Sequence, residues 1–220
     1  EKGEGTKLYE VSAWSMLMAY GLDAYRTADL PGVKTVSVKT IYDVPGKLIN
    51  LNPAYGYLFS YNDDAAVGAL LKLMDLDYKI RIARKPFTIE NESYDRGTIL
   101  IRLHENPNLV PEVIKAIAES SGITIRGVNT ALCQEGSDLG TGEYVLITPP
   151  RIAMLTGPSI SMGSFGSLWY LIDRELGMRF SIINYAQFGR ADLRKYNVLI
   201  LPSAWGAASY KNVFDERNFK

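Results

Sequence analysis

The chain has 220 residues with 47% hydrophobic content, which is typical of a globular protein of one large or two small domains. Its 24 basic and 24 acidic residues cancel, so charge gives no argument for a nucleic acid or membrane partner, and no apolar run reaches the roughly 18 to 20 residues of a membrane span. One cysteine, Cys133, and one histidine, His104, exclude an internal disulfide and the usual multi-cysteine or multi-histidine zinc site.

Two elements are predicted before the regular part of the chain. Residues 12–27, SAWSMLMAYGLDAYRT, favour a buried helix whose Met and aromatic side chains serve packing, with a binding groove as the alternative. Residues 33–44, VKTVSVKTIYDV, alternate in polarity and predict a half-buried strand. The start at Glu1, without Met or signal peptide, leads us to expect a processed or excised chain.

A regular pattern of strands and helices begins near residue 55. Asn62 or Asp63 is expected to cap the first helix, and Gly122 to end the second. The order strand-helix-strand-strand-helix-strand predicts a split βαβ plait, with a parallel α/β layer as the alternative. The predicted strands are 55–61, 78–87, 98–103 and 123–128, the helices are 62–77 and 109–122, and a polar turn covers 90–97.

A Gly-rich connection with a short closing strand leads to Pro149–Pro150, where we place a domain boundary. The strands beyond it are fully apolar and alternate with a helix, which indicates a buried parallel sheet of the doubly wound type. Only about half of such a domain fits before Lys220, so we expect a truncated sheet that is covered by self-association or by the N-terminal region. The predicted strands are 151–155, 179–184 and 196–203, and the helix is 164–176.

The Gly-Ser turn GPSISMGSFG, Gly157–Gly166, has the composition of a ligand-binding or catalytic loop. It lacks the lysine of a Walker loop and the spacing of a dinucleotide loop, and Ser164 lies one residue out of frame for a hydrolase elbow. A capped strand-to-helix turn explains it best, and an anion or small polar ligand at the helix N-terminus is the functional alternative. Hydrolysis by Ser161 or Ser164 is a distant third hypothesis. The weak ligand-binding candidates are Gly157, Ser159, Ser161, Gly163 and Ser164.

The remaining polar residues have structural explanations, and we assign no catalytic and no metal-binding residue. Cys133 has no basic neighbour to lower its pKa and is expected to be buried or inert. His104 is expected on a surface loop, and together with Glu105 it could contribute to a metal site but cannot complete one. The pair Asp63–Asp64 suits a helix N-terminus, and Asp138 suits a turn.

Three segments resemble the region downstream of the peptidase domain in large, secreted bacterial proteins of the zinc carboxypeptidase family. LYEVSAWSMLMAYGLDAY is similar to the stretch that closes the peptidase part. FSYNDDAAVGALLKLMDLDYKIRIARKPF with YDRGTILI resembles the middle module. PRIAMLTGPSISMGSFGSLWYLIDRELG with RADLRKYNVLILPS resembles the C-terminal domain, which is like class I glutamine amidotransferases.

The resemblance implies an α/β protein with an N-terminal extension at 1–50, a βαββαβ module at 51–149 and a partial amidotransferase-like, flavodoxin-like domain at 150–220. The zinc ligands of the family, an H-x-x-E pair and a later His, are absent from this chain. In amidotransferase-like domains the nucleophile turn lies beyond the third strand and its helix, a position that this chain does not reach before Lys220, so Cys133 is not expected to be its counterpart.

The implied function is that of a non-catalytic accessory region, inactive alone, that packs on the peptidase domain or regulates access to it. Zinc is expected only in that missing domain, and no cofactor is expected in this chain. The protein would be secreted or periplasmic, with the peptidase domain as partner, with self-association through the sheet as a further expectation, and without nucleic acid.

Overall fold

The computed structural model describes residues 45–205, Tyr210 and isolated positions between residues 17 and 37. The predicted helix at 12–27 and strand at 33–44 lie outside the described residues, apart from single positions. All helices and strands discussed below belong to residues 45–205, and none of them has the length and apolar character needed to cross a membrane.

A six-stranded mixed sheet with strand order β1-β7-β2-β6-β3-β8 organises the first part of the described chain. Its four inner strands are β2 (Gly56–Phe59), β3 (Arg81–Ala83), β6 (Ile99–Arg102) and β7 (Thr124–Val128). β2 is antiparallel to both β6 and β7, and β3 is antiparallel to β6. The split βαβ plait is therefore confirmed, and the alternative of a parallel layer is wrong.

Short strands extend the plait at both edges. β1 (Lys47–Ile49) runs parallel to β7, with Leu48 opposite Ile125, and β8 (Tyr144–Leu146) runs antiparallel to β3. The sequence analysis predicts β8 but not β1, which lies in the range assigned to the N-terminal extension.

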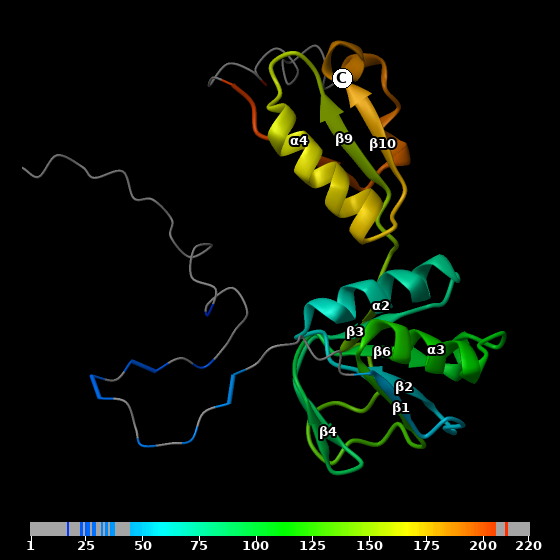
Figure 1. The fold of residues 1–220 in the computed structure, drawn as a ribbon. Coiled ribbons are helices and arrows are strands. Elements are labelled where there is room, and N and C mark those ends of the chain that lie inside the picture. Colours follow the sequence, from blue (N-terminus) through cyan, green and yellow to red (C-terminus); the bar gives the residue numbers. More distant parts are fainter. Residues whose placement is uncertain are drawn as a thin grey trace, which may run out of the picture. The chain divides into compact units, whose positions relative to one another are not determined.

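Helices α2 (Asp64–Asp75) and α3 (Pro111–Ser121) cover one face of this sheet (Figure 1). The Asp63 side chain accepts a hydrogen bond from the Ala65 N–H and caps α2 as predicted. α3 ends at Gly122, whose φ of 70° is the left-handed conformation that glycine adopts easily.

The opposite face is covered by a hairpin and by the connection between β7 and β8. The hairpin consists of β4 (Phe87–Ile89) and β5 (Glu92–Tyr94), in a segment that the sequence analysis treats partly as a polar turn. Glu90 and Asn91 form its two-residue turn with φ of 49° and 63°, an arrangement normally signalled by Asn-Gly. The buried residues of this face are Leu58, Ala83, Phe87, Ile89, Leu100, Val128, Leu139 and Tyr144.

A three-stranded parallel sheet with order β10-β9-β11 organises the second part. This is the arrangement in which a flavodoxin-like sheet begins, with the first strand between the second and third. Its strands are β9 (Ile152–Thr156), β10 (Phe180–Asn184) and β11 (Val198–Ile200). α4 (Met162–Trp169) continues as the π-helical segment η3 (Tyr170–Glu175), and the short 3-10 segments η4 (Tyr185–Arg190) and η5 (Leu193–Lys195) join β10 to β11.

The two faces of β9 enter two different clusters. Ile152 and Met154 pack with Ile172 from the helix that follows, whereas Ala153 and Leu155 pack with residues that include Phe188 of η4. β9 is therefore buried on both sides, as the apolar sequence predicts for the centre of a parallel sheet.

Candidate functional site

The Gly-Ser turn lies at the carboxyl ends of β9 and β11, where the strand order reverses. In open α/β sheets this position is the usual place of a ligand crevice. The segment after β11 lies against the turn, because the Ser161 N–H donates to the Ser203 carbonyl at 2.8 Å and the Trp205 N–H donates to the Ser159 carbonyl at 2.9 Å. The structure thus brings the predicted loop together with residues 203–205, which the sequence did not single out.

Both serine hydroxyls that could act as nucleophiles accept structural hydrogen bonds. Ser161 Oγ caps α4 by accepting from the Ser164 N–H at 3.3 Å. Ser164 Oγ accepts from the Ser203 N–H at 3.0 Å. His104, the single histidine, lies beside Tyr55 and Glu105 at the end of β6. The geometry is that of a capped strand-to-helix turn.

The glycines of the turn differ in what they contact. A Cβ on Gly157 would lie 1.9 Å from Cδ1 of Tyr185, so the close approach of this ring requires glycine. A Cβ on Gly163 would meet only Ser161 Oγ at 3.8 Å, an ordinary contact. Packing therefore explains Gly157, while Gly163 leaves its backbone accessible at the helix N-terminus.

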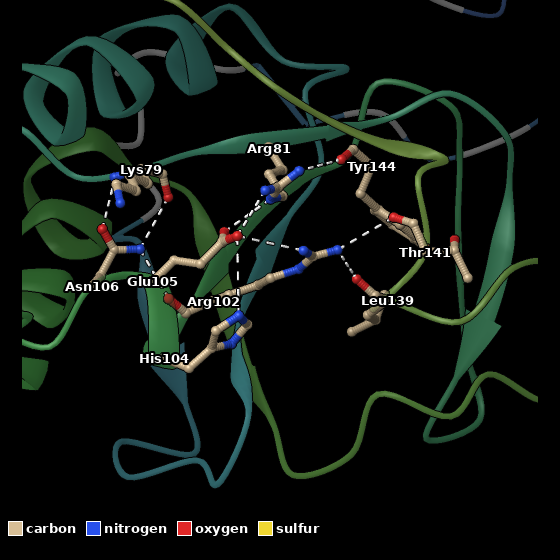
Figure 2. Close-up of polar contacts among 9 residues, drawn as sticks. All are labelled: Lys79, Arg81, Arg102, His104, Glu105, Asn106, Leu139, Thr141 and Tyr144. Carbon is tan, nitrogen blue, oxygen red and sulfur yellow. Dashed lines mark hydrogen bonds and ion pairs between the residues drawn. The ribbon is translucent and has the colours of Figure 1, made fainter.

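A second group of polar residues lies at the end of β6 and combines Arg81, Arg102 and Glu105 (Figure 2). Glu105 accepts from Arg81 Nε at 2.8 Å and from Arg81 Nη2 at 2.7 Å, and Arg102 Nη1 lies 3.6 Å from the same carboxylate. The Arg81 guanidinium lowers the pKa of the Glu105 carboxyl through these bonds, more than burial raises it. We call these three residues the charge cluster.

The charge cluster holds backbone carbonyls of the connection that precedes β8. Arg102 Nη2 donates to the Leu139 carbonyl and, at 3.5 Å, to the Thr141 carbonyl, and Arg81 Nη1 donates to the Tyr144 carbonyl at 2.9 Å. The Arg102 side chain is only 7% exposed, and its buried Nε has no acceptor among the described residues. The hydrogen bonds of Arg102 Nη2 thus serve the fold.

His104 is the exposed neighbour of the charge cluster. Its side chain is 65% exposed, its Nε2 lies 4.0 Å from Glu105 Oε1, and its ring centroid is 6.4 Å from that of Tyr55. The expected surface position of His104 is confirmed. Within the described part of the chain, no group of three or more His, Cys, Asp or Glu side chains is placed to hold a metal ion.

Cys133 lies in the connection between β7 and β8 and is partly buried. Burial raises the pKa of its thiol, although the nearby Tyr144 hydroxyl acts in the opposite direction. The backbone N–H of Cys133 donates to Asp138 Oδ1 at 2.8 Å, and the Thr141 N–H donates to the Asp138 carbonyl, so Asp138 forms the predicted turn. A thiol with a raised pKa is protonated at neutral pH and is a weak nucleophile.

The charge cluster was not predicted from the sequence, although the sequence places arginines within apolar strands. Arg81 and Arg102 are the charged residues of the otherwise apolar strands β3, RIA, and β6, ILIR, and their side chains are only 22% and 7% exposed. A charged residue at an inward position of a strand needs a partner, and in the structure this partner is Glu105.

Comparison of the chain with protein-family models, with curated proteins and with solved structures yields no match. The likeness to accessory regions of zinc carboxypeptidases therefore stays a hypothesis.

Proposed function

We propose that the chain is a non-catalytic accessory region of a secreted or periplasmic zinc carboxypeptidase-like protein. It packs on the peptidase domain or regulates access to it, and that domain holds the zinc. The observation that carries the proposal is that the side chains best suited to chemistry make structural contacts. Ser161 and Ser164 accept hydrogen bonds from backbone N–H groups, and Glu105 forms ion pairs with two arginines.

The strand order of the parallel sheet also supports this proposal. The order β10-β9-β11 matches the beginning of the flavodoxin-like domain that the family resemblance implies. Within the described residues, β11 pairs only with β9, and the exposed fractions of Val198, Leu199 and Leu201 are 38%, 37% and 43%. This apolar edge is the part of the sheet that we expect to contact the rest of the parent protein or a second copy of the chain.

The proposal is tested by the coding sequence upstream of Glu1 and by the protein that it encodes. We expect an H-x-x-E motif with a later His there, and zinc-dependent release of C-terminal amino acids from peptides by the longer protein. The isolated 220-residue chain is expected to show no release under the same conditions, with zinc added. Peptidase activity of the isolated chain, or an upstream sequence without zinc ligands, contradicts the proposal.

A second candidate function is binding of an anion or small polar molecule by Gly157–Gly166, and the position of this turn at the strand-order reversal favours it. Binding predicts a melting temperature that rises with the concentration of inorganic phosphate, a nucleotide, an amino acid or a sugar. Gly163→Asp places a carboxylate at the helix N-terminus, where it repels an anion, and should abolish the rise. A melting temperature that stays constant across these compounds removes this candidate.

A further inference from the structure

The connection between β7 and β8 contains a segment, Gly136–Gly142, with glycine at both ends. Gly136 has a φ of 82°, and a Cβ added there would lie 2.7 Å from the Pro86 carbonyl oxygen, so close packing fixes this end of the segment. A Cβ added at Gly140 or Gly142 would meet no heavy atom within 4 Å, so these two glycines supply the backbone freedom that a hinge needs at the other end. We call Gly136–Gly142 the lid segment.

One side chain fastens the lid segment to the apolar face of the six-stranded sheet. Leu139 is fully buried and packs in the cluster that contains Leu58, Leu100 and Val128, whereas the other residues of the segment are exposed or half-buried. The apolar contact of the segment with the sheet is therefore concentrated at Leu139.

Side-chain donors supply the polar attachment. Arg102 donates to the Leu139 and Thr141 carbonyls, and the Tyr144 hydroxyl donates to the Ser137 carbonyl at 2.8 Å (Figure 2 shows the arginine). Within the described chain, no ladder of backbone hydrogen bonds joins residues 136–142 to a strand. In contrast, β6 is paired with a strand on each side.

We propose that the lid segment opens and closes over the second face of the six-stranded sheet while the sheet stays folded. Opening withdraws Leu139 from its cluster and exposes the Arg102 guanidinium and the apolar face beneath to solvent. Segments with few buried contacts and no ladder open locally, at a lower free energy than global unfolding.

Native-state amide hydrogen exchange in increasing urea tests the proposal on the intact chain. The Leu139 N–H donates to the Ala131 carbonyl at 2.9 Å and is protected only while the segment is closed. We expect it to exchange faster than the amides of β6 and with a much smaller dependence on urea, because opening exposes less surface than unfolding. Equal urea dependence for Leu139 and β6 contradicts the proposal.

Two glycine variants with room for a methyl group separate local from global opening. Gly140→Ala restricts the segment in the locally open and in the globally unfolded chain alike, so it should slow the exchange of both Leu139 and β6 by about two- to fivefold. Gly68→Ala, inside α2, also adds a Cβ that meets nothing within 4 Å, and it should slow β6 exchange while leaving Leu139 unchanged. Leu139 exchange that follows the Gly68 variant overturns the proposal.

Two tyrosine variants test the attachment itself. Tyr144→Phe keeps the buried ring but removes the bond to Ser137, and it should accelerate Leu139 exchange by roughly fivefold. Tyr57→Phe removes a comparable 2.7 Å bond to the Leu51 carbonyl, away from the lid segment, and should accelerate β6 exchange but not Leu139 exchange, so the ratio of the Leu139 rate to the β6 rate should be lower than in the Tyr144 variant. Equal ratios in the two variants contradict the assigned role of Tyr144.

Discussion

The two sheets place similar apolar sequences in very different surroundings. β6, with ILIR, has strands on both sides and fully buried Ile99, Leu100 and Ile101, whereas β11, with VLI, pairs only with β9 among the described residues and leaves Leu199 37% exposed. Apolar character alone therefore does not determine burial. Burial depends on how many strands lie beside a given strand and on whether another layer covers it. The substitutions below test this conclusion.

The largest contrast is expected from the same substitution in the two strands. Leu100→Ala should lower the free energy of unfolding by about 4 kcal/mol, because it leaves a cavity in a closed cluster. Leu199→Ala should cost about 1 kcal/mol, because the side chain is partly in solvent and its surroundings can relax. Urea denaturation followed by circular dichroism measures both values, and equal losses would show that the β11 edge is covered in solution.

The charge cluster gives the next largest effect. Arg102→Met should cost about 3 kcal/mol, since it leaves the Leu139 and Thr141 carbonyls without their buried donor. Arg194→Met is the matched control, because Arg194 pairs with Asp192 in solvent and should leave the denaturation midpoint unchanged. Similar denaturation midpoints for the two variants would mean that the Arg102 hydrogen bonds make no net contribution to the free energy of unfolding.

Two glycines of the parallel sheet should respond in opposite directions. Gly157→Ala should destabilise by about 2 kcal/mol, because its methyl group collides with the Tyr185 ring. Gly166→Ala, within α4 and facing open space, should stabilise by up to about 1 kcal/mol. Thermal unfolding followed by the fluorescence of Trp169 in α4 measures both, and destabilisation by both variants would contradict a packing role specific to Gly157.

The smallest expected effect is on the dependence of stability on pH. The pKa of Glu105 is lower in the folded than in the unfolded chain, so its contribution is present above the unfolded pKa and is lost as pH falls through the folded pKa. Glu105→Gln should therefore be less stable at neutral pH and show a shallower decline in acid. The urea midpoint at several pH values measures both differences.

Much of the fold could be predicted from the sequence where periodicity and caps agreed. Asp63 marks the start of α2 through its side-chain oxygen, and Gly122 marks the end of α3 through its left-handed backbone. Both ends can be predicted from the residue type alone. The hairpin of β4 and β5 was missed because Glu90 and Asn91 occupy a turn that usually carries glycine, and because polar residues dominate β5.

The residues of the candidate sites also differ in whether the local sequence predicts their roles. The role of Ser161 as a helix cap can be predicted locally, because this residue stands directly before an apolar helical run. The contact of Ser164 with Ser203 and the charge cluster join residues far apart in the chain, and only the pairing of strands brings them together. Single-sequence reasoning supplies the need for a partner at Arg102 but not the partner's identity.

The pairing of β1 with β7 has a consequence for the order of events during synthesis. Asn50 and Gly127, which are bonded at this edge, are separated by 77 residues in the chain. A ribosome adding about 5 to 20 residues per second needs on the order of several seconds to deliver β7 after β1 has emerged. During that interval β2 also lacks a neighbour, since β7 pairs with both strands. The nascent chain therefore presents β1 and one edge of β2 unpaired until β7 is made, and this is the stage at which a chaperone would protect these edges.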